Sequence, residues 1–91
     1  MRTIREEKRV EQRIDEVRGK LPRVEEIYEG WKWRLARAPE LGYRMSGVTP
    51  DTYLALSVPE APDHPSLLFI YRFDDQYVTI IDLVITPAET N

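Results

Sequence analysis

The stretch over residues 67–85 constrains the fold most strongly. It reads LLFIYRF, then DDQ, then YVTIIDLVI, so two apolar runs rich in β-branched and aromatic residues flank a short polar break. This pattern is typical of a β-hairpin. Both runs are apolar on both alternating faces, as is usual for central strands of a sheet that is covered on each side. We therefore expect a helix, a strand or a second subunit on each face of this hairpin.

Strict alternation divides the hairpin side chains into two faces. In the first run, one face carries Leu67, Phe69, Tyr71 and Phe73, and the other carries Leu68 and Ile70. In the second run, one face carries Tyr77, Ile81 and Leu83, and the other carries Val78, Ile80 and Val84. A turn of three residues places Leu68 opposite Asp82 and Arg72 opposite Val78.

The length of the chain, 91 residues, predicts a single domain over residues 1–91. A chain of this size buries roughly 60–65% of its unfolded surface, so an oligomer or a tightly bound partner would help its stability. The chain has no Cys and one His, which argues against disulfides, a thiolate nucleophile and a metal site, and no cofactor is expected.

Most nucleic-acid-binding domains are basic, whereas the net charge of this chain is −3. RNA is therefore a disfavoured partner. No apolar run approaches the roughly 20 residues that span a bilayer. The N-terminal MRTIREEKR lacks the apolar region of a signal peptide. We therefore expect a cytoplasmic protein that does not contact a membrane.

Two helices are predicted in the first half of the chain. An apolar stripe of Val10, Ile14, Val17 and Leu21 indicates an amphipathic helix that breaks at about residues 19–21. A second helix over 22–38 starts with Pro22 in its first turn and has a core face of Val24, Ile27, Tyr28, Trp31 and Leu35. Gly30 would allow the two antiparallel helices to pack closely. Residues 2–7 are either a frayed helix start or a short edge strand.

Residues 43–58 read as a weak strand, a turn and a better strand, and three prolines make 59–66 a surface loop. In the better strand, Leu54, Leu56 and Val58 share one face and Tyr53, Ala55 and Ser57 the other. The fold class is therefore α+β, with a two-helix hairpin packed on a small antiparallel sheet of three to four strands.

Basic residues gather near the end of the second helix, where Lys32, Arg34, Arg37 and Arg44 interleave with Trp33 and Tyr43. Such a cluster is either a nucleic-acid or partner surface or a solvated helix end diluted by nearby glutamates. The carboxylate of Asp82 interrupts an apolar run and needs a partner or solvent. It pairs with an arginine such as Arg72 or Arg44, or it contacts a partner. His64 is expected to be a solvated loop residue.

The segment WKWRLARAPELGYRMSG, residues 31–47, resembles a stretch of the RelE/ParE toxin superfamily, in which a helix ends in Trp-x-Leu-x-x-x-Pro-x-x-Gly. Trp33, Leu35, Pro39 and Gly42 occupy those positions. The hairpin over 67–85 is similar to the central hairpin of that family, and the order of elements agrees over roughly residues 8–86. The resemblance implies an edge strand at residues 2–7 and a toxin of a bacterial toxin–antitoxin, plasmid-stabilisation-like pair.

The catalytic residues of the ribonuclease branch are not matched. That branch usually has an Arg two or three residues before the tyrosine of the central strand, but here Leu68, Phe69 and Ile70 precede Tyr71. Metal-free RNA cleavage needs cations and a proton-transfer group, and the nearest candidates are Arg72, Tyr71 and Arg44. The resemblance without these residues therefore implies protein–protein contact, with an antitoxin, a gyrase-like target or a second copy as the partner. The candidate binding residues are Trp33, Arg37, Tyr43 and Asp82. The alternatives are a ribosome-dependent mRNA interferase using Arg72 and Arg44, or a non-toxic homodimer with a structural or regulatory role.

Overall fold

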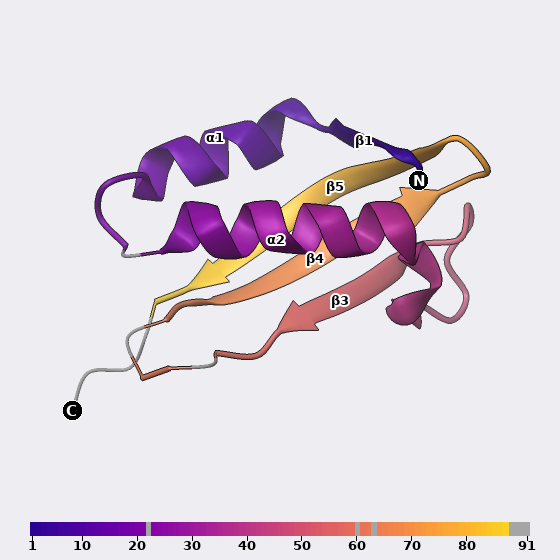
Figure 1. Cartoon of the computed structure of the whole chain (residues 1–91). Coiled ribbons are helices and arrows are strands. Elements are labelled where there is room, and N and C mark those ends of the chain that lie inside the picture. The colour runs from indigo at the N-terminus through magenta and orange to yellow at the C-terminus, as the bar shows by residue number, and fades with distance from the viewer. Residues whose placement is uncertain (22, 60, 63, 88–91) are drawn as a thin grey trace.

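The computed structural model describes residues 1–21, 23–59, 61–62 and 64–87 (Figure 1). The elements are β1 (Thr3–Glu6), α1 (Lys8–Val17), α2 (Val24–Arg37), the 3-10 turn η1 (Pro39–Leu41), β2 (Tyr43–Arg44), β3 (Tyr53–Ser57), β4 (Ser66–Phe73) and β5 (Tyr77–Thr86). One sheet joins these strands in the order β1-β5-β4-β3-β2. The α+β class is confirmed. The expected antiparallel sheet of three to four strands was wrong, because the described residues form a mixed sheet of five strands.

The fifth strand is β1, which settles the ambiguity over residues 2–7. It pairs in parallel with residues 77–80 of β5, with Ile4 beside Val78, and it forms one edge of the sheet. Ile4 is too isolated in sequence to show a period, but it packs against the core. The N–H of Arg2 donates to the carbonyl of Ala36 over 2.9 Å and joins this edge to the end of α2.

The two helices form the expected antiparallel hairpin and lie side by side in Figure 1. The apolar stripe of α1 buries Val10 and Ile14, with Val17 and Leu21 packed at its margin. The helix α2 starts at Val24, two residues later than expected, and Arg23 before it has a positive φ of 64°. Pro22, expected in the first turn, lies outside the described residues. No helix in the described ranges is long and apolar enough to cross a membrane.

The core lies between the helices and one face of the sheet, which we call the helix side. Phe69 of β4 occupies its centre, with its ring centroid 5.9 Å from that of Tyr28 and 5.7 Å from that of Trp31. The buried helix-side residues of the strands are Ala55, Leu67, Phe69, Tyr71, Val78, Ile80 and Leu83. The predicted core faces of both helices are confirmed, since Val24, Tyr28 and Leu35 are buried and Ile27 and Trp31 are half-buried.

A β-bulge in β5 corrects the expected register of the hairpin. Tyr71 lies opposite Ile80, but its neighbour Ile70 lies opposite Asp82, so Ile81 is an extra residue. This residue reverses the alternation, and Leu83 therefore joins Val78 and Ile80 on the helix side. The expected pairs of Leu68 with Asp82 and of Arg72 with Val78 were wrong, because these residues face Val84 and Thr79.

The second face of the sheet carries apolar side chains but no helix or strand of the described residues covers it (Figure 1). We call it the open face; its apolar members are Leu54, Leu56, Leu68, Ile70 and Val84. Leu56 is 55% exposed and Val84 47% exposed. The sequence predicted a cover on both faces, and within this chain the described residues provide one on the helix side alone.

Candidate functional site

Tyr71, one of the three candidate catalytic residues, is a buried core residue. Its hydroxyl donates to the carbonyl of Pro39 over 2.6 Å and accepts from the N–H of Gly42 over 3.1 Å. Burial raises the pKa of Tyr71 to about 12. A Cβ at Gly42 would collide with this hydroxyl and lie 2.6 Å from the carbonyl oxygen of Leu54, so the close approach requires glycine. The Tyr71 hydroxyl therefore joins the η1 turn to β4.

The other two catalytic candidates, Arg72 and Arg44, lie on different faces of the sheet. Arg72 lies on the open face, where its Nε donates to the hydroxyl of Thr52 over 3.2 Å. Arg44 is paired with Tyr53, which lies on the helix side, and its guanidinium binds Asp51 at 2.9 Å. Arg72 and Arg44 therefore contact the neighbouring residues Thr52 and Asp51 from different faces, whereas the Tyr71 hydroxyl is buried against Pro39.

Asp82 pairs with Arg13 of α1, whereas the sequence suggested Arg72 or Arg44. The Nε of Arg13 lies 2.7 Å from Oδ1 of Asp82, and the two side chains are 47% and 22% exposed. The hydrogen bond from Arg13 is the main reason that the pKa of Asp82 lies below its usual range. The expected pairing with Arg72 or Arg44 was wrong because α1 packs against β5 and its Arg13 reaches the Asp82 carboxylate.

The predicted cluster of basic and aromatic residues is dispersed. Trp33 is 59% exposed on α2, whereas Tyr43 is 81% exposed on β2 and is paired with Leu54 of the open face. Arg37 is exposed at the end of α2. Lys32 faces the opposite flank of that helix, where it binds Glu6 at 2.7 Å. These residues therefore form no continuous basic surface.

A concave site lies between α2 and the outer edge of β3, and we call it the α2–β3 groove. Its volume is about 630 Å³. It is lined from α2 by Ile27, Gly30, Trp31 and Arg34, with Arg23 and Glu26 at one end, and from β3 and the loop after it by Leu56, Ser57, Val58, Pro59 and His64. The sequence did not predict this groove. The one signal was Gly30 inside a helix, and it does not serve close helix packing, because a Cβ there would meet no atom within 4 Å.

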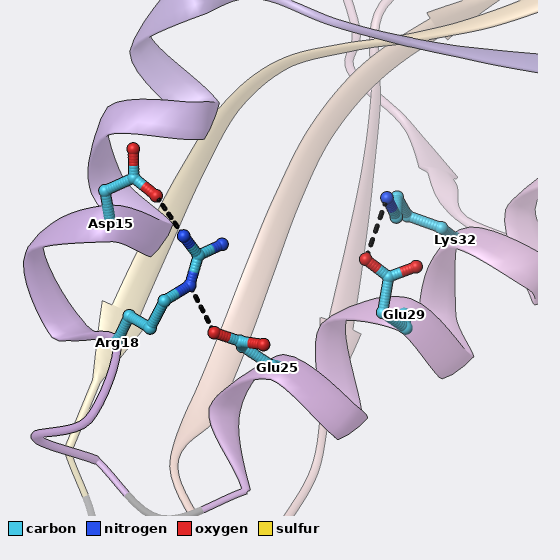
Figure 2. Close-up of polar contacts among 5 residues, drawn as sticks. All are labelled: Asp15, Arg18, Glu25, Glu29 and Lys32. Carbon is cyan, nitrogen blue, oxygen red and sulfur yellow. Dashed lines mark hydrogen bonds and ion pairs between the residues drawn. The ribbon is translucent and has the colours of Figure 1, made fainter.

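A smaller hollow of about 270 Å³ separates α1 from α2. Figure 2 shows how ion pairs line it, with Arg18 between Asp15 and Glu25 and with Lys32 beside Glu29. The Arg18–Asp15 pair measures 2.7 Å and the Lys32–Glu29 pair 3.0 Å. Its acidic lining, Glu6, Glu11, Asp15, Glu25 and Glu29, outnumbers these two cations. This flank of the helical hairpin therefore repels a polyanion.

The Tyr28 hydroxyl faces the same hollow and is buried without a hydrogen bond among the described residues. The carboxylate of Glu6 faces it without reaching hydrogen-bonding geometry, and Lys32 Nζ lies 4.9 Å from the centre of its ring. Burial, followed by the negative charges of Glu6 and Glu29, raises the pKa of Tyr28 strongly. This phenol therefore stays protonated and neutral across the physiological pH range.

Among the described residues, no group of three or more His, Cys, Asp or Glu side chains could hold a metal ion. No protein-family model, curated protein or solved structure matches this chain.

Proposed function

We propose that this chain is a toxin-like component of a bacterial toxin–antitoxin system that acts through protein–protein contact and lacks the usual mRNA-cleaving site. One observation carries the proposal. The residues nearest to a ribonuclease set, Tyr71, Arg72 and Arg44, are each engaged in a separate structural contact. The order of an edge strand, a helical hairpin and antiparallel strands supports the resemblance to the RelE/ParE superfamily.

The chemistry of RNA cleavage explains why these contacts matter. Without a metal, cations must stabilise the pentavalent phosphorus and a neighbouring group must move protons. The Tyr71 hydroxyl is buried and donates to a carbonyl, and burial raises its pKa, so it is neither accessible nor easily ionised. Arg72 and Arg44 come from opposite faces of the sheet, and each guanidinium is already engaged, with Thr52 and Asp51 respectively.

Two surfaces remain for contact with a protein. The α2–β3 groove is concave and combines apolar with charged side chains, and the open face presents exposed Leu56 and Val84. Contiguous exposed apolar surface on a small protein usually marks an interaction site. An antitoxin that covers one of these surfaces, or a gyrase-like target that binds it, fits this arrangement.

Growth of a bacterial host during induced expression tests the proposal. We expect growth arrest that is relieved by co-expression of the neighbouring gene's product, with cellular mRNA intact on Northern blots. An Arg44→Ala, Arg72→Ala double variant is the matched test of the RNA-cleaving alternative, and it should remain toxic. Harmless expression of the folded wild-type protein would contradict the toxin-like role. Fragmented mRNA in cells that express the wild type, together with loss of toxicity in the double variant, would favour an mRNA interferase.

The open face favours a second candidate function, a non-toxic homodimer with a structural or regulatory role. Its apolar residues lie on three adjacent strands, β3, β4 and β5, and a second copy could cover them. Light scattering after size exclusion should then give twice the mass of the chain, and Val84→Arg should return the mass to that of one copy. A wild-type monomer at all concentrations contradicts this candidate.

A further inference from the structure

We propose that the α2–β3 groove binds an extended acidic peptide, which pairs with the outer edge of β3 as an additional strand. The occupant is a segment of a protein partner with alternating apolar side chains and a carboxylate. The inference goes beyond the toxin-like role, because it assigns the site, the backbone geometry and the charge of the bound segment.

The first support is an unpaired strand edge. β2 pairs with residues 53 and 54 of β3 and no further, so its partner strand ends before Ala55. The carbonyl of Thr52 accepts from Met45 on this side at 2.8 Å, and the carbonyl of Leu54 faces Gly42. Backbone groups alternate between the two sides of a strand, so the N–H and C=O of Leu56 point outward at the groove. An unpaired edge of this kind accepts an added strand.

The second support is the room above this edge. Alternate side chains of an added strand would lie on the helix side, between β3 and α2. Ile27 and Trp31 are half-buried there and offer apolar contact, and Gly30 between them leaves open space where any other residue would place a side chain. The groove therefore fits an apolar side chain directly above Gly30.

The third support is an unbalanced positive charge. Arg34 lies in the groove with its guanidinium 5.1 Å from the centre of the Trp31 ring, and the described residues offer it no ion pair. Glu26, the one carboxylate in the described lining, is already bound to Arg23 at 3.2 Å. A carboxylate on the bound strand would form an ion pair with Arg34, since a guanidinium binds a carboxylate through paired hydrogen bonds.

This charge decides between an acidic peptide and a second copy of the chain. Two copies paired edge to edge through β3 would offer Arg34 no free carboxylate of the described lining, because Glu26 is already bound to Arg23. Pro59 also ends the free edge soon after Val58, so two copies would share few backbone hydrogen bonds.

Nuclear magnetic resonance on the isotope-labelled full chain tests the inference with two synthetic probes. Both are blocked peptides of about nine residues that alternate valine and threonine, long enough to cover the edge. One has a central glutamate and the other a central lysine. With the glutamate peptide, we expect shifts in the amides of Leu56 and Val58 and in the indole N–H of Trp31. Hydrogen exchange at the Leu56 amide should slow by at least about tenfold at saturation.

Substitutions at Gly30 and Arg34 separate binding in the groove from binding elsewhere on the protein surface. Gly30→Ala adds a single methyl group in this space and should weaken binding of the glutamate peptide less than Gly30→Phe does. Gly30→Phe places an aromatic ring in the space that the peptide side chain would occupy and should weaken binding by at least about tenfold. Arg34→Glu should reverse the preference and select the lysine peptide.

Each remaining outcome overturns the inference. These are no shifts with either peptide at millimolar concentration, shifts confined to the open face, a wild-type preference for the lysine peptide, or unchanged binding by a folded Gly30→Phe variant. Peptide-independent dimerisation through β3 would instead assign the edge to a second copy. Peptide binding by a protein that proves harmless in cells would refute the toxin-like role and leave this inference standing. If the partner still neutralises a toxic Gly30→Phe variant, the toxin-like role stands and this inference is refuted.

Discussion

Tyr71→Phe separates a structural from a catalytic role for the tyrosine of the central strand. The change removes one hydroxyl that donates to Pro39 at 2.6 Å and accepts from Gly42 at 3.1 Å, and it leaves the ring in the core. A net hydrogen bond contributes about 1 kcal/mol, and a buried group left unpaired costs about 1–3 kcal/mol. The Pro39 carbonyl loses its partner in buried surroundings, so we expect a loss of about 2–3 kcal/mol in the free energy of unfolding.

Urea unfolding followed by tryptophan fluorescence measures this loss, and thermal unfolding gives a second estimate. For a domain of this size the loss corresponds to a fall of about 10–20 °C in Tm. Toxicity at a temperature where the variant remains folded should be unchanged. The matched control is Tyr53→Phe, because the Tyr53 hydroxyl makes no hydrogen bond among the described residues.

A change in stability below about 0.5 kcal/mol for Tyr71→Phe, equal to that of Tyr53→Phe, would refute the structural role. Loss of toxicity in a variant that is as stable as the wild type would point instead to the Tyr71 hydroxyl as a reacting group. The two roles therefore predict opposite results in two separate measurements.

Three further predictions follow from single contacts. Asp82→Asn should lower the free energy of unfolding by about 0.5–1 kcal/mol at pH 7, because the lowered pKa of Asp82 beside Arg13 stabilises the fold above the unfolded pKa of about 3.9. That contribution is lost as the pH falls through the folded pKa, and a difference from wild type that persists at pH 2 would contradict the pairing. Gly30→Ala should raise the free energy of unfolding by about 0.5–1 kcal/mol, whereas Gly19→Ala should lower it because φ there is +82°. Trp33→Ser should change it by less than about 0.5 kcal/mol, since the indole is 59% exposed, and a larger loss in urea unfolding would show that it packs on the fold.

Periodicity predicted the parts of the fold that depend on burial. The stripe of α1, the core face of α2 and the two runs of the hairpin all follow from spacings that place apolar side chains on one side. The bulge at Ile81 could not be predicted, because Ile80, Ile81 and Leu83 are all apolar and their apolar character does not show which of them face the core. An error of one residue there moved every later side chain of β5 to the other face.

The candidate site was less predictable because it depends on distances between elements. Arg13 and Asp82 are 69 positions apart in the sequence. No spacing rule connects a side chain of α1 with one of β5, the last strand in sequence order. The α2–β3 groove depends on where β2 stops pairing with β3. The length of β2, two residues, is set by contacts in the folded protein and not by the local sequence pattern. Tyr71 was the exception, since its place among apolar residues already favoured the core.

The pairing of β1 with β5 has a consequence for how the chain folds. Thr3 lies beside Tyr77, so the strand β1 cannot pair with its neighbour until residues 77–80 have been synthesised. Contacts between such distant segments close a long loop and slow folding relative to local contacts. The two helices are neighbours in the sequence, whereas Ile4 pairs with the distant Val78 of β5 and packs against the core. During synthesis the N-terminal strand is therefore an unpaired, partly apolar edge, and its burial marks the completion of the fold.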